Sequence, residues 1–422
     1  MNIIVHNSKC NGEINITPSK SDMHRAIICS ALSKGKSVIK NVTLSLDIEA
    51  TINAFKALGA NISYVDNTLY VEGIDFNDIK GNEIDCNESG STLRFLIPIL
   101  SVLNKSFILK GSNKLLSRPL DVYKNIYSEQ GLKFNLNKDY LEIEGKIKPS
   151  VYEIEGDISS QFISGLLFSL PLLDNDSIIK VKEPFESESY VNMTLKTLSD
   201  FGIKVKRVNK NEFIVYGNQE YKSCVYNVEA DFSQFAFFAV LGAINNDLVC
   251  KGLNFNSCQG DKVILDILSH FGVNYEINED EVKVYKCNEL HGSFVDLKDC
   301  VDLGPIVMVL SLLNEDKVRI VNTKRLLFKE SNRVDAIVSN FIKLGADIEV
   351  KENEVIISPS ILTSTNEVLD SFNDHRVMMS LVVLSSVLND YTMINNPACI
   401  KKSYVGFYKD MNKLGVEVGL HD

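Results

Sequence analysis

The sequence predicts an α/β protein of two domains, each built from three copies of one repeated unit. The chain has 422 residues, more than one hydrophobic core usually serves. A marker occurs six times: an amphipathic stretch, usually ending in Leu or Phe, is followed by Gly and then by alternating apolar residues. Between markers, a hairpin pattern and two helical segments recur. Six repeats divide evenly between two domains.

The spacing of the markers is regular. Their glycines are 72, 71, 70, 73 and 70 residues apart. They are Gly59, Gly131, Gly202, Gly272, Gly345 and Gly415. A fixed period of this kind indicates copies of one supersecondary unit.

Each unit contains the same elements in the same order. After the marker glycine come two short alternating runs with Asn, Asp or Lys-Glu at the turn, as in residues 60–73, which predicts a β-hairpin. A short strand and a polar motif then precede an apolar helix, and a second helix leads to the next marker. The six polar motifs are PSKSDMHRAI, CNESGSTLRFL, GDISSQFISGL, EADFSQFAFFA, VDLGPIVMVL and FNDHRVMMSL. Each places Ser, Asp or Asn where a helix N-cap is expected.

The sixth copy is incomplete, because only seven residues follow Gly415. Strand-like runs at Asn2 to His6 and Gly12 to Ile16 supply the missing partners and lead into the first polar motif at Ser19. We therefore expect a discontinuous domain of residues 1–18 and 231–422, with residues 19–230 inserted. The crossings near 17–20 and 228–231 are short, which predicts a hinge that closes over a ligand.

Composition narrows the class of protein. The formal net charge is −11, which disfavours nucleic acid binding. Nine cysteines without a CxxC pair indicate reduced thiols, and no His or Cys spacing predicts a metal site. The apolar runs are too short to span a membrane, and the N-terminus shows no signal pattern. We expect a soluble cytoplasmic protein.

Cations and polar residues gather at the predicted helix starts. Unpaired N–H groups there attract anions by roughly 0.3 to 1 kcal/mol. Arg118 and Arg333 are expected in first helical turns, where a cation is unfavourable unless an anionic ligand offsets it. A single Lys or Arg at such a place is more often solvated, and a single Ser or Asp is often a simple cap. Such cations and polar residues recur in all the motifs except the fourth, which we interpret as structural. Their recurrence favours a cleft for a polyanionic ligand.

The ordered motifs resemble the 5-enolpyruvylshikimate-3-phosphate synthase family, a family of enolpyruvyl transferases. The resemblance runs through PSKSDMHRA, SGSTLRF, SRPL, DISSQF, KESNR, NDHR and the final KKSY. It implies an inside-out α/β prism with two lobes of three βαβαββ units. It also implies transfer of the carboxyvinyl group of phosphoenolpyruvate to the 5-hydroxyl of shikimate 3-phosphate, with release of phosphate, in aromatic amino acid biosynthesis. No cofactor or metal is expected, and we expect a monomer.

The resemblance assigns the site residues. For shikimate 3-phosphate these are Lys20, Ser21, Arg25, Ser159, Ser160, Gln161, Ser187, Tyr190, Asp302 and Lys329. For phosphoenolpyruvate they are Lys20, Gly90, Arg118, Gln161, Arg333, Arg376 and Lys402. Lys20 contacts both ligands and is grouped with the catalytic residues. Asp302 matches the base on the attacking hydroxyl, and Glu330 matches the group linked to proton transfer at the methylene carbon. The reaction needs an acid and a base together, and two carboxylates in different settings supply them, with Glu330 between Lys329 and Arg333 and Asp302 in an uncharged motif.

Three positions depart from the family pattern. Glu88 and Arg325 stand where Asn is usual, and Phe95 stands where Pro occurs in relatives. Gly90 is unsubstituted, which predicts a target sensitive to glyphosate. Two alternatives remain: the sister transferase that acts on UDP-N-acetylglucosamine, and a catalytically silent anion-binding protein of this fold. The first motif reads Lys-Ser rather than the sister enzyme's Lys-Asn, and carboxylates in the site would not help a protein that only binds anions.

Overall fold

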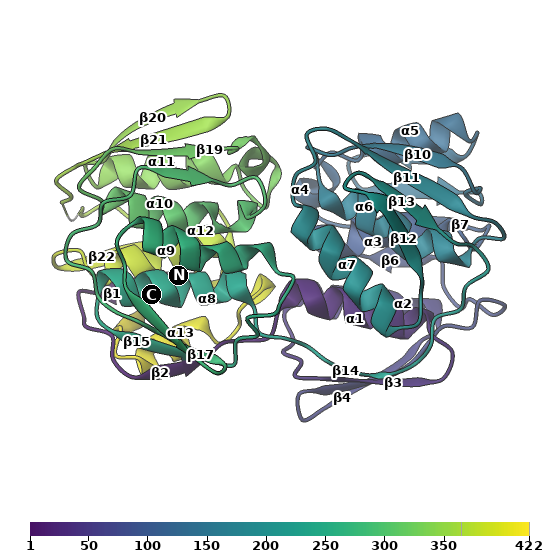
Figure 1. Ribbon diagram of the computed structural model, residues 1–422, viewed down its shortest axis with the longest axis horizontal. Coiled ribbons are helices and arrows are strands. Elements are labelled where there is room, and N and C mark those ends of the chain that lie inside the picture. Colours follow the sequence, from purple (N-terminus) through teal and green to yellow (C-terminus); the bar gives the residue numbers. More distant parts are fainter. Residues whose placement is uncertain (364, 422) are drawn as a thin grey trace. The chain divides into compact units, whose positions relative to one another are not determined.

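The computed structural model describes residues 1–363 and 365–421 and has the predicted α/β class (Figure 1). The chain forms two compact units, which we call unit 1 (residues 1–17 and 229–422) and unit 2 (residues 18–228). The described residues of each unit form three small β-sheets.

The elements of each unit follow the repeat. In unit 2 the strands are β3 Lys36–Lys40, β4 Asn61–Val65, β5 Thr68–Glu72, β6 Glu83–Asp85, β7 Ser106–Lys110, β8 Lys133–Leu136, β9 Tyr140–Glu144, β10 Val151–Glu155, β11 Ser177–Lys182, β12 Val205–Asn209, β13 Glu212–Val215 and β14 Val225–Asn227. Its helices are α1 Lys20–Leu32, α2 Leu46–Leu58, α3 Gly90–Leu100, α4 Asn113–Leu116, α5 Asp121–Glu129, α6 Ser160–Ser169, the 3-10 helix η1 Leu170–Leu172 and α7 Glu188–Asp200.

In unit 1 the strands are β1 Asn2–His6, β2 Glu13–Asn15, β15 Leu248–Lys251, β16 Tyr275–Asn278, β17 Glu281–Val284, β18 Phe294–Asp296, β19 Val318–Val321, β20 Asp347–Lys351, β21 Glu354–Ser358, β22 Tyr391–Asn395 and β23 Val418–His421. Its helices are α8 Phe232–Ile244, η2 Gly260–Val263, α9 Ile264–His270, η3 Val301–Leu303, α10 Gly304–Leu312, η4 Lys324–Phe328, α11 Arg333–Lys343, α12 His375–Ser385, η5 Pro397–Lys402 and α13 Phe407–Lys413.

The four-stranded sheets formed by the described residues share one pattern of parallel and antiparallel pairs. In the sheet β6-β7-β9-β8, the strand before the polar motif pairs in parallel with the strand after the first helix, and the hairpin that follows adds two antiparallel strands. A parallel pair needs a crossover, and here the first helix of the repeat supplies it. In Figure 1, β3, β4 and β14 lie below α1 and α2, which pack on this sheet.

The helices that follow the polar motifs form the centre of each unit. Every residue of α8, α10 and α12 is buried, as are nearly all residues of α1, α3 and α6. The second helices bury one face, as in α11, and the sheets alternate buried and exposed residues, as in β10. Helices buried on all sides inside a ring of half-exposed sheets give the inside-out arrangement.

The marker glycines end the second helices or the turns that follow them. All six have a positive φ, from 68° at Gly131 to 111° at Gly59. Residues with a Cβ rarely adopt this left-handed conformation, whereas glycine adopts it readily at the end of a helix. The repeat therefore marks the points where the chain leaves a helix and enters a hairpin.

The N-terminal strands pair within unit 1, as predicted, but not both in the sixth sheet. Strand β1 lies between β22 and β23 and completes that sheet. Strand β2 instead pairs with β15 in the sheet of the fourth repeat, and β14, just before the fourth polar motif, pairs with β3 of the first repeat. Two strands are thus exchanged. An isolated bridge between Leu369 and Ile394 stands where the sixth sheet lacks its fourth strand.

Five of the six polar motifs cap a helix as predicted. Ser19, Ser89, Ser159, Asp231 and Asp374 accept hydrogen bonds from N–H groups of the first turn. The fifth motif differs, because a 3-10 turn, η3, precedes α10 and no side chain caps it. Asp302 lies in that turn, so its carboxylate contacts other side chains instead of the helix start.

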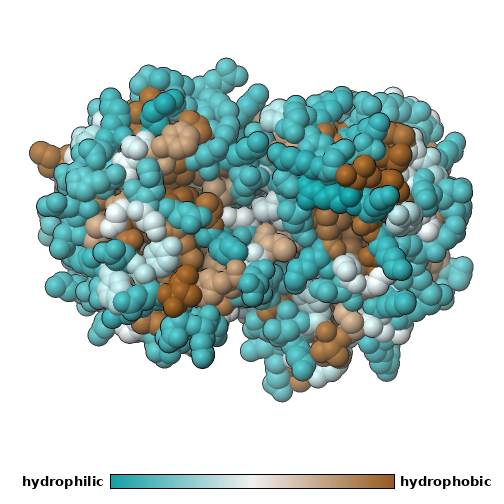
Figure 2. All heavy atoms as spheres, viewed as in Figure 1, coloured by the Kyte–Doolittle hydropathy of each residue, from teal (hydrophilic) through white to brown (hydrophobic). Residues whose placement is uncertain are grey.

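Two large apolar clusters form the cores, one in each unit. Hydrophilic residues cover most of the face seen in Figure 2, and hydrophobic residues show there in separate groups. Among the described residues, no helix has both the length and the apolar character needed to cross a membrane.

Candidate active site

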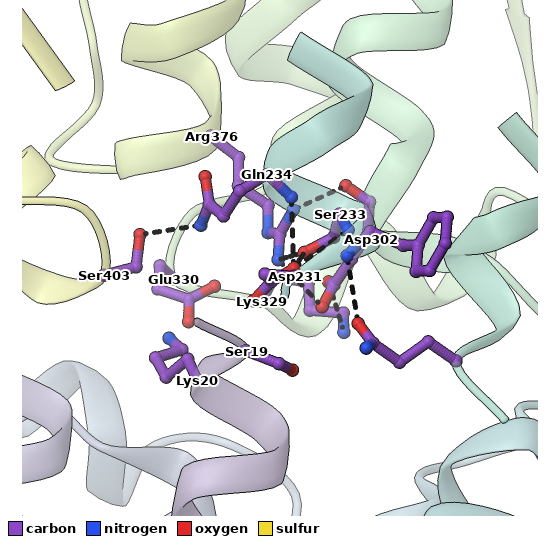
Figure 3. A network of polar contacts seen from close by, with 12 residues as sticks. Ser19, Lys20, Asp231, Ser233, Gln234, Asp302, Lys329, Glu330, Arg376 and Ser403 are labelled. Atoms are coloured by element: carbon purple, nitrogen blue, oxygen red, sulfur yellow. Dashed lines mark hydrogen bonds and ion pairs between the residues drawn. The ribbon is translucent and has the colours of Figure 1, made fainter. Parts of the chain in front are cut away.

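In unit 1, the carboxylate of Asp302 lies among three cations. Its Oδ1 is 2.9 Å from Arg333 Nη1 and 3.1 Å from Lys329 Nζ, and its Oδ2 is 3.4 Å from Arg376 Nη2. Figure 3 shows the side chains of Asp302, Lys329 and Arg376 converging. The expectation of an uncharged setting for Asp302 was therefore wrong, because cations from the fifth and sixth repeats surround it.

Arg333 is the centre of this cluster. It is the first residue of α11, its side chain is 1% exposed, and it contacts three carboxylates. Nε lies 2.8 Å from Asp374, Nη1 lies 2.9 Å from Asp302, and Nη2 lies 2.7 Å from Glu330. The planar guanidinium suits this arrangement, because its donors point in fixed directions. It holds both proposed catalytic carboxylates in defined positions.

The ionisation of the cluster follows from burial and charge. Burial alone would raise the pKa of Asp302, but Arg376, Lys329 and Arg333 bring it well below its usual value. Burial would also raise the pKa of Asp374, but the charges of Arg333 and His375 and the hydrogen bond from Arg333 together bring it below its usual value. Burial lowers the pKa of Lys329, although Asp302 opposes this. Asp302 is therefore a carboxylate at neutral pH, the form that a base requires.

The fourth and sixth motifs complete this half of the site. Arg376 donates through Nη1 to the Asp302 carbonyl at 3.2 Å and through Nη2 to Ser233 Oγ at 2.9 Å. Ser233 belongs to the fourth motif, which was interpreted as structural, and the contact shows that this motif holds the side chain of Arg376. Lys402, at the end of η5, donates to the carbonyl of Asn373 at 2.6 Å, so it lies beside the same motif as Arg376.

In unit 2, the start of α1 presents Lys20, Ser21 and Arg25. Lys20 Nζ lies 2.7 Å from Asp47 Oδ2 on α2. The guanidinium of Arg25 donates to Ser21 O at 2.6 Å, to Tyr190 O at 2.9 Å and to Thr194 Oγ1 at 2.9 Å. Burial lowers the pKa of Arg25 to about 10, which leaves it protonated at neutral pH.

The start of α3 forms a narrow cradle. A Cβ on Gly90 would lie 2.9 Å from Arg118 Nη1 and 3.9 Å from Gln161 Oε1, so a larger residue there would displace the guanidinium of Arg118. Gln161 accepts from Arg94 Nη1 at 2.8 Å and donates to Ser91 Oγ at 2.9 Å. Arg118 was expected in a first helical turn. It lies instead in the segment between α4 and α5. The helix-dipole argument therefore applies to Arg333 and not to Arg118.

The remaining predicted residues lie at the starts of α6 and α7. Ser159 caps α6, where its hydroxyl accepts from the Gln161 N–H at 3.3 Å, and Ser160 is the first helical residue. Ser187 precedes α7 with φ of 55°, a conformation uncommon for residues with a side chain. Tyr190 lies in the first turn of α7, and its carbonyl accepts from Arg25.

The structure also reveals contacts that the sequence interpretation missed. Asp47, Thr194, Ser233 and Asp374 each hold a predicted site cation in place. The sequence could have indicated a role for Asp374, because it is the first residue of the Asp-His-Arg motif. The other three lie on helices that become neighbours of the site only in the folded protein. Among the described residues, no cluster of His, Cys, Asp and Glu suits a metal ion.

Comparison with known proteins agrees with this geometry. The family model of EPSP synthase (3-phosphoshikimate 1-carboxyvinyltransferase) matches residues 4–411. The chain belongs to the EPSP synthase family. It is 41% identical to the 3-phosphoshikimate 1-carboxyvinyltransferase of Clostridium novyi, with 98% of this chain and 97% of that protein covered. It is also 41% identical to the Clostridium kluyveri protein of the same name, with 99% and 98% covered.

Solved structures share the fold across the chain. EPSP synthase from Acinetobacter baumannii matches with a TM-score of 0.82 at 20% identity, covering all of both chains. The enolpyruvyl transferase NikO from Streptomyces tendae matches with a TM-score of 0.81 at 14% identity, covering 99% of this chain and 98% of that one. The fold of the EPSP synthase family is thus present in full.

Proposed function

We propose that this chain transfers the carboxyvinyl group of phosphoenolpyruvate to the 5-hydroxyl of shikimate 3-phosphate and releases phosphate. It is a 3-phosphoshikimate 1-carboxyvinyltransferase (EC 2.5.1.19) of the shikimate pathway by its family. The observation that carries the chemistry is the placement of Asp302 and Glu330 on one buried arginine, Arg333. A protein that only bound anions would gain nothing from two carboxylates there.

Shikimate 3-phosphate would be held mainly by residues of α1, α6 and α7. Its phosphate suits the cationic Arg25 and the hydroxyls around it, because charge-assisted hydrogen bonds to phosphate are strong. Asp302 and Lys329 would contact the sugar-like ring. The proposed set is Lys20, Ser21, Arg25, Ser159, Ser160, Gln161, Ser187, Tyr190, Asp302 and Lys329.

Phosphoenolpyruvate carries a carboxylate and a phosphate, and arginine forks bind both groups. In unit 2, Arg118 beside Gly90 supplies such a fork. In unit 1, Arg333, Arg376 and Lys402 lie around the Asp302 cluster. The proposed set is Lys20, Gly90, Arg118, Gln161, Arg333, Arg376 and Lys402.

The reaction needs two proton transfers at the start. The 5-hydroxyl oxygen attacks C2 of phosphoenolpyruvate, a base takes the hydroxyl proton, and an acid gives a proton to C3. Loss of phosphate from C2 and of a proton from C3 then restores the double bond. We assign Asp302 as the base and Glu330 as the group that exchanges the proton at C3, with Lys20 as the third catalytic residue. The cations stabilise the departing phosphate.

Binding of phosphoenolpyruvate would make Asp302 a better base. Arg333 and Arg376 share their donors between Asp302 and other acceptors. When a substrate carboxylate or phosphate takes some of those donors, Asp302 loses part of the positive field that lowers its pKa. The base would thus strengthen when phosphoenolpyruvate is bound.

The test is phosphate release from phosphoenolpyruvate with shikimate 3-phosphate or UDP-N-acetylglucosamine as the acceptor. Release with shikimate 3-phosphate as the acceptor, and not with UDP-N-acetylglucosamine, supports the proposal. Release with the sugar nucleotide alone would assign the sister reaction, and release with neither would leave an anion-binding protein. We further propose that the chain acts as a cytoplasmic monomer without a cofactor, that a hinge lies near residues 17–20 and 228–231, and that glyphosate inhibits it.

A further inference from the structure

A buried chain of hydrogen bonds joins helices α1, α2 and α3 of unit 2. His24 Nδ1 lies 2.8 Å from Thr51 Oγ1, and Thr51 Oγ1 lies 2.7 Å from Thr92 Oγ1. Thr92 Oγ1 then donates to Ser89 Oγ at 2.7 Å. All four side chains are 1% exposed or less, and they come from α1, α2, the first turn of α3 and its N-cap.

In this chain of hydrogen bonds, each donor points the same way, from His24 toward Ser89. A threonine hydroxyl carries one hydrogen, and Thr92 gives its hydrogen to Ser89. The hydrogen between the two threonines must then come from Thr51, so Thr51 accepts its other bond from His24 Nδ1–H. His24 is therefore the neutral tautomer with hydrogen on Nδ1. Its Nε2 is buried and makes no hydrogen bond within the described residues, which agrees with a ring that carries no second proton.

This chain of hydrogen bonds lies one helical turn along α1 and α2 from the ion pair between Lys20 and Asp47, a contact of the proposed site. Lys20 and His24 are four residues apart on α1, and Asp47 and Thr51 are four residues apart on α2. Residues at this spacing share a helix face. The Lys20–Asp47 ion pair and the His24–Thr51 hydrogen bond thus join the same two helices at successive turns. Thr92 and Ser89 extend the connection to the helix that begins at Gly90.

We propose that the chain His24–Thr51–Thr92–Ser89 is a positioning device for the reaction. It sets the relative placement of α1, α2 and α3, and so the distance between Lys20, Ser21 and Arg25 on one helix start and the Gly90 cradle on another. This inference rests on the proposed function, because it concerns the alignment of two bound substrates. None of the four side chains needs to touch a substrate.

Apolar packing alone would hold these helices with less precision. Buried polar groups cost free energy unless each finds a partner, and a directed chain satisfies its members only in one arrangement of the helices. Reacting groups held in the right geometry gain much of their rate from alignment, and small displacements are costly. The chain of hydrogen bonds therefore restricts the alignment of the two substrates, on which the rate of their reaction depends strongly.

The test compares three variants of the full-length protein with the wild type. Thr51→Val keeps the shape of the side chain but leaves His24 Nδ1–H without an acceptor and Thr92 without a donor. Thr51→Ser restores the hydroxyl. Ser33→Ala is the matched control, because it removes a buried hydroxyl at the other end of α1 that bonds only to Cys29 O among the described contacts.

We expect Thr51→Val to lower kcat roughly tenfold to a hundredfold through misalignment, with the dissociation constant for shikimate 3-phosphate alone changed by less than about threefold. Thr51→Ser should recover most of kcat, and Ser33→Ala should retain it. Calorimetry gives the dissociation constant, phosphate release gives kcat, and the ¹⁵N shifts of His24 report the Nδ1–H tautomer in the wild type and its loss as a hydrogen-bond donor in Thr51→Val.

Other results would overturn the inference. If Thr51→Val lowers the melting temperature but keeps kcat, as Ser33→Ala should, the chain only stabilises the fold. A wild-type His24 with hydrogen on Nε2 would contradict the direction of the chain. If the wild type and Ser33→Ala release no phosphate, the proposed function fails first, and the positioning role fails with it.

Discussion

Replacing Asp302 with Asn tests the proposed base directly. Asn keeps the size of the side chain and one carbonyl oxygen, but it removes the charge that faces Arg333, Lys329 and Arg376 at 2.9, 3.1 and 3.4 Å. The amide also cannot accept the hydroxyl proton. The substitution therefore separates two effects: loss of a base and loss of a counter-ion.

The contacts set the expected size of each effect. Unit charges about 3 Å apart attract by roughly 5 kcal/mol at an effective dielectric constant of about 20, before desolvation is counted. Arg333 keeps Asp374 and Glu330, and Arg376 keeps Ser233, so Lys329 loses most. Removing one partner of a buried pair costs about 3 to 5 kcal/mol, and the retained carbonyl favours the lower end. Loss of a general base lowers kcat by about 10² to 10⁴-fold.

The pH dependence has a sign that follows from the cluster. Asp302 has a lowered pKa in the folded protein, so it stabilises the wild type above its unfolded pKa and the benefit is lost as pH falls through the folded value. Lys329 has a lowered pKa too, and without Asp302 it falls further. A lysine that binds fewer protons when folded makes stability rise with pH. The stability difference between wild type and Asp302→Asn should therefore be largest near neutral pH and narrow toward both acid and alkaline pH.

The assays are phosphate release near neutral pH and thermal unfolding between about pH 2 and pH 10, because the contribution of Asp302 is lost only below its ordinary pKa, with Asp347→Asn as the control. Asp347 is an exposed carboxylate on β20 of the same unit. If Asp302→Asn retained kcat within about tenfold, catalysis would not need a base at this position. A stability difference independent of pH would show that the charges around Asp302 do not interact as the distances imply.

Three further predictions concern the anion-binding groups, each checked by steady-state kinetics. Arg118→Lys should raise KM for phosphoenolpyruvate about tenfold, because lysine lacks the fork, and an unchanged KM would contradict a role in binding. Gly90→Ala should raise it as well and weaken inhibition by glyphosate, since the new Cβ would lie 2.9 Å from Arg118 Nη1; full inhibition would refute this cradle. Ser233→Ala should raise KM about fivefold by releasing Arg376, the effect of one lost hydrogen bond of about 1 kcal/mol.

The fold was predictable because its signals are local. A glycine ends each second helix with a positive φ, and five polar motifs supply the N-cap that their composition implied. Both features depend on a few neighbouring residues and their backbone conformation. The partners of β2 and β14 were less accessible, because which sheet receives a strand depends on where the chain crosses between units.

The surroundings of the site residues were not predictable, because they come from distant repeats. Asp302 looked uncharged among Val, Leu and Gly, yet its cations arrive from positions 27, 31 and 74 residues later in the chain. Ser233 looked like a capping residue and holds Arg376. The motifs predict which residues take part, whereas the charges around those residues depend on packing between repeats.

The arginines of the two units differ in the partners that surround them. In unit 2, the hydrogen bonds of Arg25 run to oxygens of the backbone and of Thr194, and those of Arg94 run to Gln161 and a backbone carbonyl. In unit 1, Arg333 is matched by three carboxylates, and together with Arg376 and Lys329 it keeps the pKa of Asp302 well below its usual value. Neutral acceptors orient a guanidinium that is to bind an anion, whereas carboxylates fix an arginine that is to control a proton transfer. We therefore expect the arginines of unit 2 to serve mainly in binding phosphate and Arg333 mainly in positioning the proposed base.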